Sequence, residues 1–149
     1  MKDLYWLRNE RKKNTEENSN VLVVADSADS EDKIERSDNR IYFYSEVSRT
    51  KVLQLNREIR NLGIDIAQLR NTLSVKEVPN IYLHVNSYGG SVFAGLAAVD
   101  YIKNSKIPVT SVIDGCAASA ATMMSIVADY RSMHQHSFML IHQLSSGMW

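Results

Sequence analysis

The sequence has little of what marks secreted, membrane-spanning or nucleic-acid-binding proteins. Cys116 is the only cysteine among 149 residues, so no intrachain disulfide can form, and we predict a cytoplasmic protein. No window of about 18 uncharged apolar residues occurs, and no unbroken apolar core lies near Met1, so neither a membrane span nor a secretory leader is expected. Lys plus Arg and Asp plus Glu number 17 each, which argues against nucleic acid or an anionic membrane as a partner.

Signatures of nucleotide and metal binding are missing as well. The sequence has no G-x-S-x-G elbow, no Walker loop and no G-x-G-x-x-G. We therefore expect no bound cofactor in this chain. His134, His136 and His142 form too small a ligand set for a metal site, with only Asp129 as a neighbouring carboxylate.

The charges that are present are unevenly placed. More than half of them lie in residues 1–40, and only three lie after residue 109. We therefore predict a polar N-terminal extension and linker at residues 1–39 and one compact domain at residues 40–149. Within the extension, the apolar cluster at residues 4–7 is either a docking element or part of a frayed tail, and residues 21–24 predict a short strand.

The clearest periodicity is an apolar stripe whose members are alternately three and four residues apart. This spacing predicts one face of a long amphipathic helix at residues 52–73. A coiled coil is the alternative, but the stripe covers only about three heptads, and Gly63 within it costs a helix roughly 1 kcal/mol relative to alanine. We expect the helix to pack on the domain, with its far end available to a neighbouring subunit. The stripe consists of Val52, Leu55, Ile59, Leu62, Ile66, Leu69 and Leu73.

Segments of strand and helix character alternate through the rest of the domain. Strands are predicted at residues 41–44, 81–85, 109–113 and 138–141, and helices at residues 92–104 and 119–128. In the first of these helices Leu96, Val99 and Ile102 are expected to face inward, and the second is apolar almost all round and should be buried. The alternation predicts an α/β fold with a largely parallel sheet.

Ser119 is the strongest candidate for a catalytic residue. It follows a run of small residues and opens an apolar helix, where the hydroxyl has room and feels the positive end of the helix dipole. A serine hydroxyl needs a base to take its proton, and an imidazole titrates near neutrality. We therefore predict that His142, at the end of the next apolar strand, is the base that activates Ser119 as a nucleophile.

A glycine pair upstream predicts the donors that such chemistry needs. Gly89 and Gly90 follow a strand, and glycine lets the backbone approach a ligand closely. The N–H of Ala120, directly after the serine, is the natural second donor for an oxyanion. Each feature alone has a plainer explanation, since such a serine is usually a helix cap, a Gly-Gly a turn and a histidine a structural residue. Cys116, a rival nucleophile by position, is expected to be a small packed residue.

In this order the motifs resemble those of the proteolytic subunit of the Clp protease. The resemblance runs from about Arg40 to Gln143. It implies a crotonase-like (ClpP-type) fold of stacked ββα units and a self-compartmentalising serine endopeptidase. The matching segments lie at residues 81–92, 94–95, 115–119 and 139–143.

The resemblance also assigns roles and partners. It implies Ser119 as nucleophile, His142 as base, and Gly90 and Ala120 as oxyanion donors, with Gly89 in support. Unfolded polypeptides would be hydrolysed through an acyl-enzyme inside a homo-oligomer of stacked heptameric rings. An AAA+ unfoldase would use the ATP, and this chain would bind none.

The chain departs from the family pattern at several positions. Tyr88 and Leu144 stand where the family usually has proline, which favours a divergent, phage-encoded member. The family's third triad residue, an aspartate, lies well downstream of the histidine, and no acidic residue follows His142 here. We therefore expect a C-terminally truncated chain, weakly active or inactive alone, because losing that carboxylate can cost about 10⁴ in turnover. Asp114 and Asp129 are poor substitutes for it.

Three other functions stay open on the sequence. One is a phage head-maturation protease with the same chemistry, which gene neighbours would separate from the first reading. Another is a non-catalytic structural paralogue, which the missing aspartate favours and the pair Ser119 and His142 disfavours. The last is a crotonase-type acyl-CoA enzyme with the same oxyanion hole, which CoA binding would support.

Overall fold

The computed structural model describes residues 32–143, apart from residues 75 and 78. All of them belong to a compact unit that begins at Glu31. The predictions for residues 4–7 and 21–24 lie outside the described residues. The elements in chain order are β1 (Lys33–Ser37), β2 (Arg40–Tyr44), α2 (Arg49–Leu73), β3 (Ile81–Ser87), α3 (Val92–Lys103), β4 (Val109–Ala118), α4 (Ala120–Ile126), β5 (Tyr130–Met133) and β6 (Phe138–Leu140).

The strands form one mixed sheet in the order β1-β2-β3-β4-β5, with β6 also paired to β4. Only β1 is antiparallel to its neighbour, and every other pairing is parallel. β5 pairs with the first half of β4, up to Ile113↔Met133, and β6 pairs with the second half, from Cys116↔Phe138. The long central strand β4 therefore changes its outer partner halfway along.

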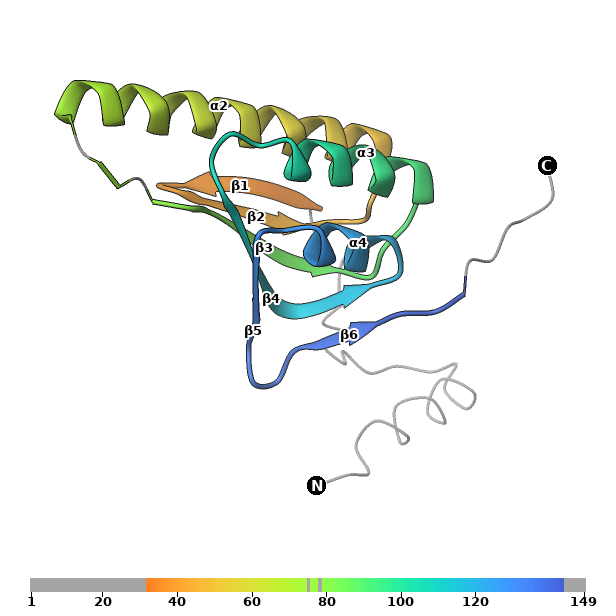
Figure 1. Cartoon of the computed structure of the whole chain (residues 1–149). Coiled ribbons are helices and arrows are strands. Elements are labelled where there is room, and N and C mark those ends of the chain that lie inside the picture. Colours follow the sequence, from red (N-terminus) through yellow and green to blue (C-terminus); the bar gives the residue numbers. More distant parts are fainter. Residues whose placement is uncertain (1–31, 75, 78, 144–149) are drawn as a thin grey trace, which may run out of the picture. The chain divides into compact units, whose positions relative to one another are not determined.

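The helices cover one face of this sheet. Figure 1 shows α2 and α3 side by side above the strands, with α4 between α3 and β4, in agreement with the packing of α3 on α2 and on α4. The inward side chains of β2 and β3 are almost completely buried beneath them, because apolar residues alternate along these strands. The core includes Ile41, Phe43, Leu83 and Val85. The predicted α/β fold with a largely parallel sheet is confirmed.

Two strands, the end of β4 and one boundary differ from the sequence-based expectation. β4 was predicted to end at residue 113 and continues to Ala118. β1 and β5 were not predicted, because their side chains are almost all exposed and polar residues interrupt any apolar pattern. Backbone pairing, rather than side-chain burial, holds these two strands at the sheet. Since β1 precedes Arg40, the compact unit starts earlier than the boundary expected there.

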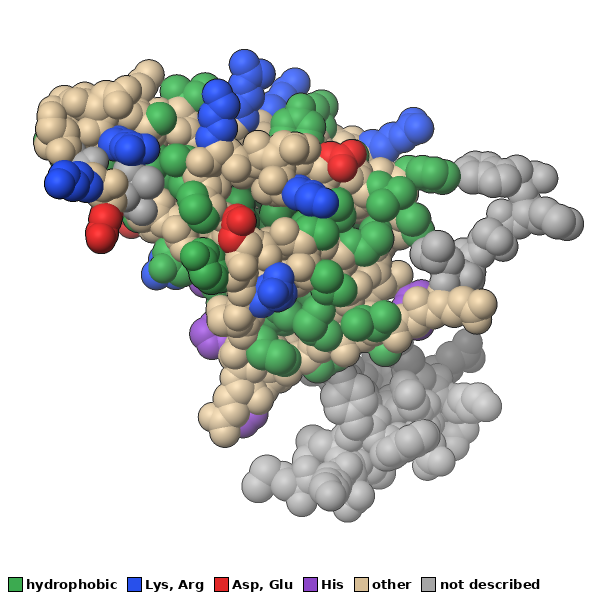
Figure 2. All heavy atoms as spheres, in the orientation of Figure 1, with side chains coloured by type: hydrophobic (Ala, Val, Ile, Leu, Met, Phe, Trp, Pro, Cys, Tyr) green, Lys and Arg blue, Asp and Glu red, His purple; other side chains and the backbone are tan. Residues whose placement is uncertain are grey.

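Helix α2 follows the apolar stripe for most of its length. Ser48 caps it by accepting a hydrogen bond from the Lys51 N–H at 3.4 Å, and the stripe is buried as far as Ile66. Leu69 and Leu73 beyond it are 51% and 61% exposed. Figure 2 shows Lys and Arg side chains along the outer face of α2, as an amphipathic helix requires.

The shorter helices agree less evenly with the sequence. In α3, Ile102 is buried and Val99 half-buried, but Leu96 is 46% exposed, so its predicted inward position was wrong. The helix turns its small residues Ala94, Gly95 and Ala98 inward instead, which lets it approach its neighbours closely. α4 is buried over most of its surface, as predicted. No helix of the described part combines the length and the apolarity that crossing a membrane requires.

Candidate active site

Ser119 occupies a strained turn between β4 and α4. Its backbone has φ 53° and ψ −125°, a region that non-glycine residues rarely adopt and that costs about 1–3 kcal/mol. It stands at the N-cap position of α4, yet its side chain accepts no capping hydrogen bond. Ser119 is therefore not explained as a helix cap, and its hydroxyl makes no hydrogen bond within the described residues.

The glycine turn lies directly against this serine. Gly89 has φ 99°, and a Cβ added to it would lie 2.7 Å from the Ala118 oxygen and 2.7 Å from the Ser119 Cβ. Gly90 has φ 145°, and a Cβ there would lie 2.5 Å from the Val47 oxygen. Both positions therefore require glycine, for conformation as well as for space. The structure brings together two turns that are some thirty residues apart in sequence.

Two backbone hydrogen bonds join the glycine turn to Val47, near the start of the domain. The Val47 N–H donates to the Gly89 oxygen at 2.8 Å, and the Ser91 N–H donates to the Val47 oxygen at 2.8 Å. Within the described residues the N–H groups of Gly90 and Ala120 donate no hydrogen bond. The two N–H groups that the sequence predicts as oxyanion donors are therefore not engaged within the described residues.

His142 follows the strand that holds the serine turn. The Ser119 N–H donates to the Leu140 oxygen at 2.9 Å, so β6 carries the chain past Ser119 toward His142. His142 is exposed, and its Nδ1 lies 2.7 Å from the Gln143 oxygen. A carbonyl oxygen only accepts, so Nδ1 is the donor in this contact, and in the neutral imidazole the lone pair that a base needs then lies on Nε2. No hydrogen bond joins Ser119 and His142 in this structure.

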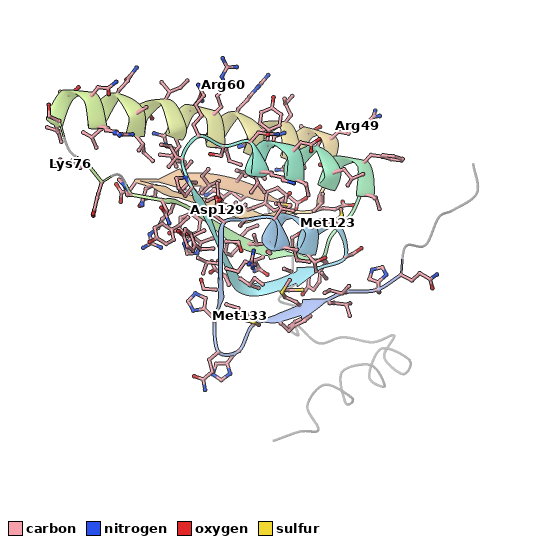
Figure 3. All side chains as sticks on the ribbon, in the orientation of Figure 1. Arg49, Arg60, Lys76, Met123, Asp129 and Met133 are labelled. Carbon is pink, nitrogen blue, oxygen red and sulfur yellow. The ribbon has the colours of Figure 1, made fainter. Side chains whose placement is uncertain are left out.

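Packing behind the serine turn is close. The Thr122 hydroxyl and backbone N–H both donate to the backbone carbonyl oxygen of Ser119, at 2.6 and 3.0 Å. Gly95 of α3 lies against α4, where a Cβ would fall 3.3 Å from the Ala120 Cβ and 2.6 Å from the end of Met123. Figure 3 shows Met123 where α4 faces α3. The first turn of α4 is therefore fixed by its own residues and by α3.

Neither candidate for a substitute carboxylate reaches this site. Asp129 accepts a hydrogen bond from the Val109 N–H at 2.7 Å, which places it at the start of β4, the opposite end from Ser119 (Figure 3). Asp114 is engaged by Tyr44 at 2.6 Å, by His84 at 2.9 Å and by His134 at 3.3 Å. Both carboxylates therefore have structural partners.

Asp114 forms the centre of a polar cluster on the sheet face away from α4. Arg40 Nη1 lies 3.0 Å from His84 Nε2, and the Tyr42 ring stacks on the His84 ring at 4.6 Å. Burial, followed by the hydrogen bond to Asp114, raises the pKa of Tyr44 to about 12. Since the ordinary value is 10.0, the neutral phenol is favoured in the folded state.

This cluster predicts a pH effect that can be measured directly. Tyr44 should ionise near pH 12 in the folded protein, and its contribution to stability, complete below pH 10, should be lost as the pH rises from about 10 to about 12. Ultraviolet absorbance of tyrosinate, compared between the wild type and Tyr44→Phe, reports this ionisation. In Asp114→Ala the pKa of Tyr44 should move back toward 10.0, and an unchanged titration would contradict the contribution of Asp114.

The remaining side chains weighed on the sequence have plain structural roles. Cys116 is 3% exposed, and burial raises the pKa of its thiol, so it is held protonated and packed. His134 contacts Asp114, and His136 is exposed. Among the described residues no group of His, Cys, Asp or Glu is arranged to hold a metal.

Sequence reasoning missed one residue that the site uses. Asn86 accepts a hydrogen bond from the Cys116 N–H at 3.2 Å, and a Cβ on Gly115 would lie 2.8 Å from the same Asn86 oxygen. Asn86 therefore joins the strand before the glycine turn to the strand before Ser119. Its position within the segment 81–92, which resembles the family, was the only signal in the sequence.

Together the parallel sheet, the helices on one face and the strand–turn–helix around Ser119 define an α/β protein of the crotonase-like, ClpP-type fold. The model of the family described as Clp protease matches residues 34–149. The chain belongs to the Clp protease family.

Curated relatives agree with this assignment. An ATP-dependent Clp protease proteolytic subunit from Streptococcus mutans is 33% identical over 116 residues, covering 75% of this chain and 59% of the relative. One from Borrelia garinii is 35% identical over 109 residues, covering 70% and 56%. A mutant ClpP1 from Listeria monocytogenes shares the fold with a TM-score of 0.52 at 24% identity, covering 66% of this chain and 57% of that one. The chain thus spans less than two thirds of the length of these relatives.

Proposed function

We propose that the chain is the proteolytic subunit of a Clp-type protease and that it hydrolyses peptide bonds with Ser119 as nucleophile. The observation that carries the proposal is the backbone of Ser119. It is held at φ 53° and ψ −125° between a strand and a helix, with no capping bond to explain the strain. A strained strand-to-helix turn is the device by which other serine hydrolases present a nucleophile.

The surrounding groups supply the other parts of acyl transfer. Ser119 Oγ attacks the peptide carbonyl carbon while His142 Nε2 takes the hydroxyl proton, and the Gly90 and Ala120 N–H groups receive the oxyanion. His142 then gives the proton to the leaving amine, which leaves an acyl-enzyme. Water attacks the acyl carbon, His142 takes its proton and returns it to Ser119 Oγ, and the carboxylate product departs.

Exposed apolar side chains beside the glycine turn and along β6 support a polypeptide substrate and a homo-oligomer. Tyr88 is 84% exposed, Phe93 72%, Phe138 52% and Ile141 71%. So many large apolar groups around one site favour contact with extended peptide or with another subunit. Figure 2 shows apolar side chains gathered on the face below α2. The family's heptameric ring is the proposed assembly.

The proposal includes an unfoldase partner and no cofactor in this chain. The relatives carry the description ATP-dependent, and no Walker loop occurs in this sequence. An AAA+ protein would therefore use the ATP and deliver unfolded polypeptides. The head-maturation alternative shares the serine chemistry and differs only in the source of its substrate.

The proposal is tested by reaction with a fluorophosphonate probe. Purified full-length chain, shown to be folded by circular dichroism, should be labelled at Ser119, and peptide mapping by mass spectrometry should find no other labelled serine. Ser119→Ala should abolish the label. Ser91→Ala is the matched control, because Ser91 caps α3 and contributes no nucleophile. A folded chain that is not labelled would favour the structural paralogue instead.

A further inference from the structure

The strand pair that carries both catalytic turns contains a marked irregularity. Val85 of β3 pairs with Ile113 of β4, but Ser87 pairs with Ala117, so the register advances two residues on β3 and four on β4. Asn86 alone therefore faces the stretch of β4 between Ile113 and Ala117. An irregularity of this kind redirects the strand that follows it.

The side chain of Asn86 occupies this irregularity. Its Oδ1 accepts from the Cys116 N–H at 3.2 Å, and it lies so close to Gly115 that any Cβ there would meet it at 2.8 Å. Gly115 is thus required by the approach of the carboxamide rather than by its own conformation. The close fit fixes where β4 goes beyond Cys116.

The segment of β4 beyond Cys116 leads directly to Ser119 in the candidate active site. At this residue β4 takes β6 as its partner, and three residues later Ser119 donates its N–H to Leu140. On the other strand, Asn86 is three residues ahead of Gly89, which touches the Ser119 Cβ position. One carboxamide therefore connects the strand that leads to the oxyanion turn with the strand that leads to the nucleophile.

We infer that Asn86 is a positioning residue, which holds the Gly90 and Ala120 donors in line with Ser119 by fixing the β4 irregularity. The inference rests on the proposed function. Its action is through the backbone, so it touches no substrate. A displacement of about 1 Å between a nucleophile and its donors can cost about a hundredfold in rate.

The test compares Asn86→Leu with a matched variant at the other end of the same strand pair. Asn80, directly before β3, donates its Nδ2 to Thr110 Oγ1 of β4 at 3.1 Å, so Asn80→Leu also removes a side-chain bond between the two segments, but at the end of β4 away from the serine. N86L should lower the limiting rate of Ser119 labelling by about ten- to a hundredfold, with probe affinity little changed. N80L should label at nearly the wild-type rate, and N86D, which keeps an acceptor oxygen, should recover most of the loss.

The outcomes separate this inference from the proposed function. Wild-type labelling that N86L leaves unchanged, or that N80L lowers equally, overturns the positioning role. Failure of N86D to recover any rate would overturn the role of the acceptor. If the folded wild type is not labelled at all, the proposed function fails. In that case amide hydrogen exchange of Cys116 tests whether Asn86 fixes the irregularity in β4. Faster exchange in N86L than in N80L supports this role, and equal exchange overturns it.

Discussion

The His142→Ala variant should label with a fluorophosphonate at least about 10³-fold more slowly than the wild type. The reason is that a serine hydroxyl attacks only as its proton is removed. In the proposed mechanism that proton goes to Nε2 of His142, because Nδ1 is engaged with the Gln143 oxygen. Labelling rates measured by mass spectrometry over a range of probe concentrations separate the limiting rate from affinity. The loss should fall on the limiting rate.

The chain offers a matched control for this variant in His136. It is exposed like His142, and it has no hydrogen bond or ion pair within the described residues. His136→Ala should therefore label at the wild-type rate and unfold at the same urea concentration. Equal labelling of the two histidine variants would remove His142 from the mechanism, even if Ser119 itself were labelled.

Gly89→Ala should both inactivate the site and destabilise the fold. The new Cβ would lie 2.7 Å from the Ala118 oxygen and from the Ser119 Cβ, closer than real Cβ contacts come, and at a φ of 99° that L residues rarely adopt. Neither neighbour yields cheaply, because Ala118 is paired with Leu140 in the sheet. We expect labelling of Ser119 to fall at least about a hundredfold and the free energy of unfolding to fall by about 2–4 kcal/mol.

Gly63→Ala is the matched glycine variant. Gly63 lies inside α2, and the nearest atom to an added Cβ is Ile107 Cγ1 at 3.9 Å, an ordinary contact. Alanine there should raise the free energy of unfolding by up to about 1 kcal/mol, since glycine is a poor helix former. Urea titrations followed by circular dichroism compare the two. A Gly89→Ala chain that unfolds and labels like the wild type would show that the glycine turn does not lie against Ser119.

Much of the fold could be predicted from local pattern because burial was local to each element. The apolar stripe in α2 and the β-branched runs of β2 and β3 follow the periods of helix and strand, so their positions agree with the structure closely. The start of β4 was predicted as well, but the strand continues past residue 113 to Ala118. β1 and β5 could not be found this way. Except for Ile34, their side chains face solvent, and their stability comes from hydrogen bonds to neighbours that a local window does not contain.

Part of the candidate site could likewise be predicted from the sequence, and part could not. Residue type and order pointed to Ser119, His142, Gly90 and Ala120, and their catalytic roles stay predictions. Pattern did not indicate that Asn86 holds the irregularity in β4, because the Cys116 N–H that it binds is thirty residues away. Nor did it indicate which partners occupy the Asp114 carboxylate.

The sequence by itself determined most of the helices and strands and which residues are candidates for the chemistry, because periodicity and side-chain chemistry are properties of the local chain. Only the tertiary structure decided that Gly89 lies against the Ser119 Cβ and that β4 exchanges β5 for β6 just before the serine. It also decided that the serine backbone takes a strained conformation. These features arise where strands far apart in sequence meet, so each depends on the packing of the whole sheet.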